Sequence, residues 1–253
     1  MSGTIEVATG TSVRAVFTTR RGGVSEGPFR GLNLGVATGD RPERVRANRI
    51  SLCDELGVDA DRVSMARQVH GTRVQSLSAP SRPGRFAGGL RGWPEADALA
   101  TTRPGLVVLV LAADCLPVLV WRRDGSGVAA AHAGWRGLVG GVVEKAVAAV
   151  GGEPSGLGAA IGPGIGPARY TVGPEVRDRF ASRFGEGVVV GDAVHLAAAA
   201  RGALVGAGVA PAAIHTVEAC THEDERRFFS YRRDGAHTGR QAGLVWIAGE
   251  EGA

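Results

Sequence analysis

Two short apolar segments near the middle of the chain constrain the fold most strongly. Residues 106–113 are continuously apolar, and residues 116–121 form a second run that suits a β-strand. An apolar run of this length is typical of a strand whose two faces are both covered. It is also far shorter than the roughly 20 residues that a helix needs to span a membrane. The two runs therefore predict a layered fold and argue against a membrane protein.

A strand and a helix are predicted in the first quarter of the chain. Residues 13–19 form a β-type run that leads into a glycine-rich loop ending near Gly35. Asp40 and Glu43 have the spacing of a capping box, and Gly57 is placed to end the helix that follows. Four apolar residues share one face of that helix: Val45, Leu52, Cys53 and Leu56. We expect this face to lie in the core.

Further along the chain, helices and strands alternate irregularly. Residues 137–150 and 194–205 suit helices, the first closed by glycines and the second preceded by Asp192 as a candidate cap. Residues 76–94 contain Pro, Gly and Arg without a clear period and are predicted to form a surface loop. No repeat or shift in composition marks a linker, and mixed folds of this length often form one domain. We predict mixed α/β layers in one domain, residues 1–253.

The charge pattern argues against nucleic acid as a partner. The formal net charge is +4, and the basic side chains are almost all arginines scattered along the chain, with Lys145 as the sole lysine. The N-terminal sequence MSGTIEVATG lacks the basic region and apolar stretch of an export signal. Three cysteines, an odd number, do not suggest a disulfide framework and fit a reducing compartment. We expect a cytoplasmic protein with no membrane partner, and the sequence leaves its oligomeric state open.

A predicted hairpin brings a cysteine close to a histidine. Asp124 and Gly125 lie between two β-type runs, which is typical of two strands joined by a turn. If Trp121 pairs with Val128, then Pro117 pairs with His132. Cys115 lies two residues before Pro117, on the same face, so Cys115 and His132 become diagonal neighbours about 7 Å apart or less. One metal ion could bridge the two side chains.

Three residues are the candidate metal ligands and catalytic residues: His70, Cys115 and His132. A thiolate and two imidazoles suit zinc or copper, and three protein ligands leave a position open for water or substrate. The same residues have a simpler interpretation, in which His70 beside a glycine is a turn residue and Cys115 is a small core residue. The role of Asp114 is open in the same way, because this residue could orient a ligand or cap a turn.

Seven sequence blocks in a fixed order resemble one bacterial family. They are TTRRGGVSEGPFRGLNLG, RQVHG, EADALATTRPG, ADCLPVLV, AHAGWRGLVGGVVE, IGPGIGP and FFSYRRDGAHTGRQAGL. Together they are similar to the laccase-domain family, whose members are also called polyphenol oxidase, purine nucleoside phosphorylase or peptidoglycan editing factor. Several independent blocks in the same order are far more specific than any single motif.

The resemblance implies a metal site and a fold. Members of the family bind zinc through the His of the VHG block, the Cys of the ADC block and the His of the HAGWRG block, which correspond to His70, Cys115 and His132. The family also implies a layered α+β fold with cysteine-hydrolase-like architecture. The chain departs from the family after IGPGIGP, where Ala168 and Arg169 stand in place of the usual cysteines.

Three residues are candidates for substrate binding: Arg21, Asn33 and Arg136. Arg21 precedes two glycines, Arg136 lies in AGWRG, and guanidinium groups with free backbone amides can hold a phosphate. Asn33 lies in the glycine-rich loop that follows Arg21. Surface arginines without a ligand are the alternative interpretation.

The resemblance implies a zinc-dependent enzyme of purine nucleosides. We expect phosphorolysis of adenosine, inosine, guanosine and methylthioadenosine, with adenosine deamination as a second activity, so the partners are a small nucleoside and phosphate. Two alternatives are a copper-dependent polyphenol oxidase and a Cys-His hydrolase that edits peptidoglycan precursors. The chain has six histidines and no His-x-His pair, whereas a four-copper laccase needs many histidines in such pairs. The oxidase is therefore the less favoured alternative.

Overall fold

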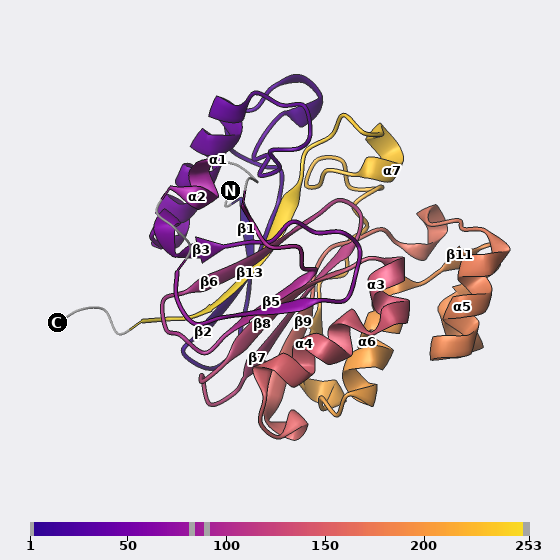
Figure 1. The fold of residues 1–253 in the computed structure, drawn as a ribbon. Helices are drawn as coiled ribbons and strands as arrows, with labels where there is room; N and C mark the ends of the chain where they lie inside the picture. Colours follow the sequence, from indigo (N-terminus) through magenta and orange to yellow (C-terminus); the bar gives the residue numbers. More distant parts are fainter. Residues whose placement is uncertain (1–2, 81–83, 89–91, 250–253) are drawn as a thin grey trace.

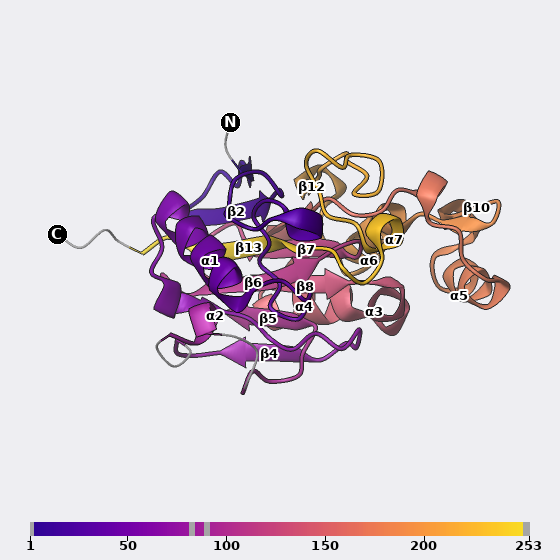
Figure 2. The ribbon, with the colours of Figure 1, turned by 90° about the horizontal axis from the view of Figure 1, so that it is seen from above.

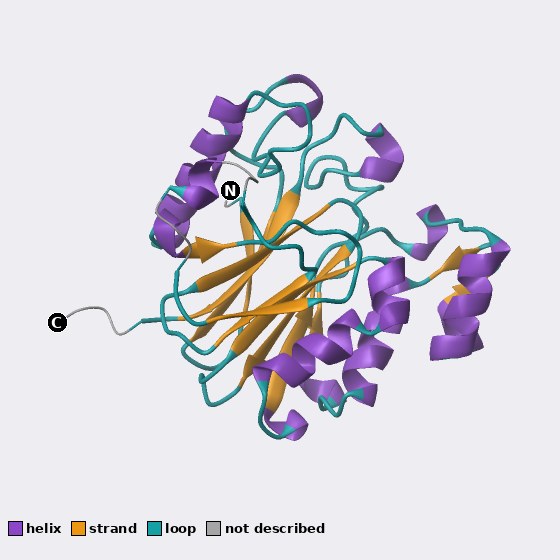
Figure 3. Ribbon diagram, in the orientation of Figure 1, coloured by secondary structure: helices purple, strands orange, loops and turns teal. Residues whose placement is uncertain are grey.

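Two mixed β-sheets lie face to face in the middle of the molecule, and helices cover the outer side of each (Figures 1 and 3). The computed structural model describes residues 3–80, 84–88 and 92–249. Its apolar residues form three clusters, one between the sheets and one between each sheet and its helices. The order of the layers is therefore helix, sheet, sheet, helix. The predicted single α+β domain of mixed sheets with flanking helices is confirmed.

The first sheet has five strands. Their order is β1 (Thr4–Val7), β2 (Val13–Thr18), β13 (Gln241–Ile247), β6 (Val107–Ala112) and β3 (Val63–Ser64). Only the pair β3 and β6 is parallel. The C-terminal strand β13 thus lies in the centre of the sheet, beside strands from the beginning and the middle of the chain (Figure 1).

The second sheet has six strands and contains the predicted hairpin. Their order is β12 (Ile214–Thr216), β9 (Leu157–Ile161), β7 (Leu116–Arg122), β8 (Val128–Ala133), β5 (Ala98–Thr101) and β4 (Val74–Leu77). Strands β7 and β8 pair Trp121 with Val128 and Pro117 with His132. The predicted register is therefore confirmed.

Strand β7 shows why the central strands are apolar on both faces. Successive side chains of a strand point to opposite faces. Val118 and Val120 pack in the cluster under the helices, whereas Leu119 and Trp121 pack in the cluster between the sheets. Both faces are buried, so neither face needs a polar residue.

Seven α-helices surround the sheets in the described part of the chain. They are α1 (Pro42–Leu56), α2 (Arg85–Gly88), α3 (Trp135–Gly140), α4 (Val142–Val150), α5 (Pro174–Phe184), α6 (Leu196–Gly206) and α7 (Tyr231–Asp234). Helices α1 and α2 cover the first sheet, and α4 and α6 cover the second. The hairpin of β10 (Val189–Val190) and β11 (Ala193–Val194) lies with α5 beside the sandwich (Figure 2).

The apolar face of α1 is buried as predicted, but its N-terminal cap is not. Arg41 is the N-cap, and its side chain makes no capping hydrogen bond, so the predicted capping box is wrong. The Asp40 carboxylate accepts hydrogen bonds from the Arg41 N–H and from Ser25 and Asn33 in the preceding loop. At the other end, Gly57 adopts the left-handed conformation with φ +66°, as its predicted role requires.

Three other predicted boundaries change. The predicted helix over residues 137–150 is two helices, because Gly141 turns the chain with φ +87° between α3 and α4. The helix predicted to start near residue 194 begins at Leu196, and the side chain of His195 caps it. The predicted surface loop over residues 76–94 contains part of β4, helix α2 and a buried Phe86, while residues 81–83 and 89–91 lie outside the described residues.

Among the helices that the structure describes, none has the length and apolar character to cross a membrane.

Candidate metal centre and active site

His70, Cys115 and His132 meet at one end of the sandwich. His70 lies in the loop between β3 and β4, Cys115 in the link between β6 and β7, and His132 near the end of β8. One ligand atom from each residue lies within 4.8 Å of the other two. The two imidazole rings are 4.9 Å apart between centroids and nearly perpendicular. The structure thus brings together all three residues that the sequence nominates.

Gly134 makes the close approach of these side chains possible. A β-carbon at this position would lie 2.7 Å from the Cys115 Sγ atom and 3.3 Å from the His70 ring. The first of these distances is too short for any real side chain, so a larger residue would push the thiol away. The glycine in the HAGWRG block therefore has a steric role beside the three candidate ligands.

The Asp97 carboxylate holds both histidines in place. It is fully buried directly before β5, and its Oδ1 atom lies 2.9 Å from His132 Nδ1. It also accepts hydrogen bonds from the backbone N–H groups of Val69, His70 and Gly71. His70 has φ +59°, a left-handed conformation that is costly for a residue with a side chain. These three hydrogen bonds stabilise that turn, while the bond to Nδ1 leaves His132 Nε2 free to face the ligand site.

Cys115 and His132 stabilise each other as an ion pair in the metal-free protein. Burial by itself raises the pKa of the Cys115 thiol, but the charge and hydrogen bonds of His132 and His70 outweigh it and lower the pKa to about 6. Burial likewise disfavours the charged form of His132, but the Cys115 thiolate and the Asp97 carboxylate together raise its pKa to about 9. A deprotonated thiol is the form that binds a metal ion or attacks an electrophile.

In the metal-free protein, we expect Cys115 to react with iodoacetamide much faster than Cys53 at pH 7. The rate at Cys115 should rise with pH through about 6 and then level off, because the thiol loses its proton across that range. Burial raises the pKa of Cys53 to about 12, so that thiol stays protonated. Mass spectrometry of peptides after timed labelling measures each site. Zinc should protect Cys115, and equal labelling of both cysteines at pH 7 would contradict the expectation.

A cavity of about 720 Å³ opens beside the three ligands. Three aromatic side chains line it, and an arginine lies over each ring: Arg136 over Trp135, Arg232 over Tyr170 and Arg240 over Tyr231. The guanidinium carbons lie 4.3, 5.0 and 6.0 Å from the respective ring centroids. We call these three contacts the three arginine–aromatic pairs. The volume of the cavity is within the range of pockets that enclose small organic ligands.

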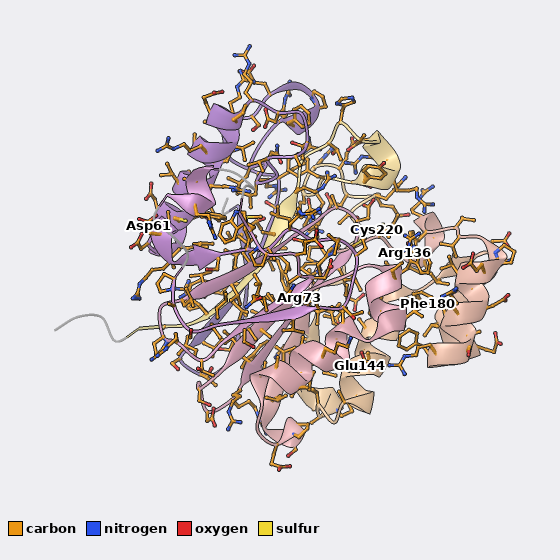
Figure 4. All side chains as sticks on the ribbon, in the orientation of Figure 1. Asp61, Arg73, Arg136, Glu144, Phe180 and Cys220 are labelled. Atoms are coloured by element: carbon orange, nitrogen blue, oxygen red, sulfur yellow. The ribbon has the colours of Figure 1, made fainter. Side chains whose placement is uncertain are left out.

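Of the three predicted substrate-binding residues, only Arg136 lines the cavity. It lies in the first turn of α3 (Figure 4). Arg21 is not in the lining. Asn33 is fully buried behind it, where its Oδ1 atom accepts hydrogen bonds from the backbone N–H groups of Gly35 and Arg240. Gly35 and Arg240 themselves line the cavity, so Asn33 shapes the wall from behind.

Sequence reasoning missed Asp97 and the arginines of the C-terminal segment. Asp97 lies in the EADALATTRPG block and Arg240 in the last block, so both belong to blocks that carry the family resemblance. In the FFSYRRDG segment, Phe228 and Phe229 are fully buried core residues, whereas Tyr231 and Arg232 line the cavity. The roles of Asp97 and of these arginines leave no pattern in the spacing of residues along the sequence, because they depend on contacts between distant parts of the chain.

Most of the chain matches one known family. Residues 14–248 match the family described as multi-copper polyphenol oxidoreductase laccase. The chain belongs to this laccase family. It is 42% identical over 246 residues to a purine nucleoside phosphorylase of Pseudomonas aeruginosa and 39% over 241 residues to purine nucleoside phosphorylase YfiH of Escherichia coli. The alignments cover 93% of this chain in both cases, and 93% and 94% of the two relatives.

Solved structures of similar proteins have the same fold. A Neisseria meningitidis protein superposes with a TM-score of 0.85 at 37% identity, over 98% of this chain and all of the other. YlmD from Geobacillus stearothermophilus superposes with a TM-score of 0.86 at 31% identity, over 98% and 97% of the two chains. The family resemblance predicted from the seven blocks is confirmed.

The donor set fits one metal ion. A thiolate and two imidazoles are the ligands that zinc prefers, and the Asp97–His132 bond is the usual support of a metal-binding histidine. In the described parts of the chain, no second group of three His, Cys, Asp or Glu residues is placed to hold another ion. The described residues therefore do not fit the several copper ions that the family description names.

Proposed function

We propose that the chain is a zinc-dependent purine nucleoside phosphorylase that acts on adenosine, inosine, guanosine and methylthioadenosine, with adenosine deamination as a second activity. The observation that carries the proposal is the His70–Cys115–His132 group at the wall of a cavity of nucleoside size. The names of the relatives in Pseudomonas aeruginosa and Escherichia coli support the same reaction class. The three free cysteines fit a cytoplasmic location.

The proposed function gives the cavity residues three different roles. His70, Cys115 and His132 would hold the metal, which when bound supplies positive charge and Lewis acidity. Asp97 orients the His132 imidazole through its Nδ1 atom and holds the backbone that carries His70. The rings of Trp135, Tyr170 and Tyr231 offer flat faces for a purine base.

Two other reactions use the same residues differently. In a Cys-His hydrolase acting on peptidoglycan precursors, Cys115 would be the nucleophile and His132 its base. The ion pair between them is compatible with that role. A multi-copper oxidase fits less well, because the described residues supply one group of ligands.

Adenosine with inorganic phosphate is expected to yield adenine and ribose 1-phosphate, as the C1′–N9 bond breaks and phosphate oxygen bonds to C1′. Protein purified without a metal-chelating tag should carry about one zinc per chain, and chromatography of the products should show equal amounts of the two. Deamination should need no phosphate and should yield inosine and ammonia. A metal-free preparation with full activity, or phenol oxidation with no nucleoside turnover, would overturn the proposal.

A further inference from the structure

Three cationic side chains at the cavity have no anionic partner. Within the described ranges, Arg136, Arg232 and Arg240 form no salt bridge, and each lies over the aromatic ring of its arginine–aromatic pair. The stacking holds each guanidinium in place without neutralising it. By contrast, Arg67 in the same lining pairs with Glu95. Three arginines held by rings thus bring uncompensated positive charge to one cavity.

Arg240 is the most constrained of the three. It is half-buried, and its Nη1 atom donates hydrogen bonds to the carbonyl oxygens of Thr238 and Gly239. In the described chain its Nε and Nη2 groups donate to no protein acceptor, so donors remain for a ligand. The Arg240 backbone N–H donates a hydrogen bond to the Asn33 Oδ1 atom, which fixes the backbone at Arg240. Burial lowers the pKa of Arg240, which reflects the cost of a charge that lacks a close partner.

Arg232 and Arg136 both line the cavity and both act electrostatically on Tyr170. Burial, the Cys115 thiolate and the Asp114 carboxylate together raise the pKa of Tyr170 to about 12, and Arg232 and Arg136 oppose that rise. Arg232 donates one hydrogen bond, to the carbonyl of Thr171, while Arg136 donates none from its side chain to the described residues. Both guanidinium groups therefore keep donors for a ligand.

Two negative groups lie nearby and limit what the arginines can bind. The Asp114 carboxylate accepts hydrogen bonds from the Thr221 hydroxyl and the Arg232 backbone N–H, which satisfy both of its oxygens. The Cys115 thiolate is directed at the metal site. Both act on Arg240 through space, and neither forms a contact ion pair with it. Three guanidinium groups thus outnumber two negative groups, one of which a metal ion would neutralise.

We propose that Arg136, Arg232 and Arg240 form the phosphate subsite of this cavity, with Arg240 as its main ligand. This inference rests on the proposed function, because it assigns the inorganic phosphate of the phosphorolysis to these residues. A tetrahedral phosphate suits guanidinium groups, whose paired N–H donors match two of its oxygens. The phosphate would lie in the same cavity as the His70–Cys115–His132 group, where the nucleoside is expected.

Calorimetric titration of the zinc-loaded protein with inorganic phosphate tests the subsite directly. We expect Arg240→Met to weaken phosphate binding by about 10- to 100-fold, the loss typical of a charge-assisted hydrogen-bonded pair. Arg136→Met, at an exposed position, should weaken it less, and Arg240→Lys should restore part of it. Arg201→Met is the control, because this side chain lies outside the cavity and donates to the carbonyls of Ile214 and Pro211. It removes the same charge and should leave binding unchanged.

Steady-state kinetics separates this inference from the proposed function. Arg240→Met should raise the KM for phosphate by a similar factor and leave the KM for adenosine and the zinc content unchanged. If Arg240→Met and Arg136→Met both bound phosphate with wild-type affinity while the wild type performed phosphorolysis, the subsite would be overturned and the function would stand. A wild type that binds phosphate through Arg240 without phosphorolysis would overturn the function and leave an anion site. Binding of adenosine 5′-monophosphate but not of inorganic phosphate would overturn the co-substrate assignment.

Discussion

Replacing His70, Cys115 or His132 by alanine is expected to remove the metal and the phosphorolysis together, with activity lower by about 1000-fold or more. Each residue supplies one of three donor atoms that lie within 4.8 Å of one another, so losing one dismantles the site. The triple variant should be no worse than the single variants, because residues that act as a unit are not additive. Elemental analysis measures zinc, and chromatography measures nucleoside turnover.

His70 separates this interpretation from the hydrolase. With Cys115 as nucleophile and His132 as base, His70→Ala should spare the covalent step and the alkylation of the thiol. With a metal site, His70→Ala should be as inactive as the other two variants and equally poor in zinc. A His70→Ala protein that keeps wild-type zinc and turnover, beside an inert Cys115→Ala, would show that the three-ligand site is wrong. Circular dichroism checks that each variant is folded.

Asp97→Asn is expected to weaken zinc binding by about 10- to 100-fold, the usual cost of losing the carboxylate behind a metal-binding histidine. The Asn side chain has one acceptor oxygen and an NH₂ group, so it cannot accept all the hydrogen bonds that Val69, His70, Gly71 and His132 now donate. The free energy of unfolding of the metal-free protein should also fall by about 1–3 kcal/mol, because buried donors lose their partner. A chelator competition assay measures the affinity, and urea denaturation measures the stability.

Asp124→Asn is the matched control for Asp97→Asn. Asp124 also accepts several hydrogen bonds, from Arg122 and Ser126, but it lies in the exposed hairpin turn between β7 and β8. Its replacement should leave the affinity for zinc at the wild-type value. If Asp97→Asn also bound zinc like the wild type, Asp97 would be a structural residue of β5 with no role at the metal centre.

The parts of the fold that follow from short-range patterns could be predicted. The turn at Asp124 and Gly125 fixed the pairing of Pro117 with His132, because a two-strand hairpin leaves little choice of register. The apolar face and the glycine stop of α1 were likewise visible in one stretch of sequence. The N-cap was not, because Arg41 takes that position, and the Asp40 carboxylate before it accepts hydrogen bonds from Ser25, Asn33 and the Arg41 N–H.

The site residues that were missed depend on contacts across the fold. Asp97 is adjacent in space to His132 but 35 residues away in sequence, and its carboxylate reaches a third segment around His70. Arg136 and Trp135 are neighbours in the sequence, whereas Arg232 of α7 lies over Tyr170 from the distant segment before α5. The meeting of the pairs at one cavity depends on the packing of α3, α7, the segment around Tyr170 and the loop before β13. Asn33 was nominated as a substrate contact from its loop, and the structure places it one layer behind Arg240.

Two of the three candidate ligands lie where the chain crosses from one sheet to the other. His70 follows β3 of the first sheet and precedes β4 of the second, and Cys115 lies between β6 of the first and β7 of the second. An ion held there joins both crossing segments to β8, so it acts as a cross-link at the end of the sandwich. Separation of the sheets would pull the ligands apart, and binding to the native state alone makes the ion add to the stability of the sandwich. We therefore expect loss of the proposed ion and opening of the two sheets to be coupled events.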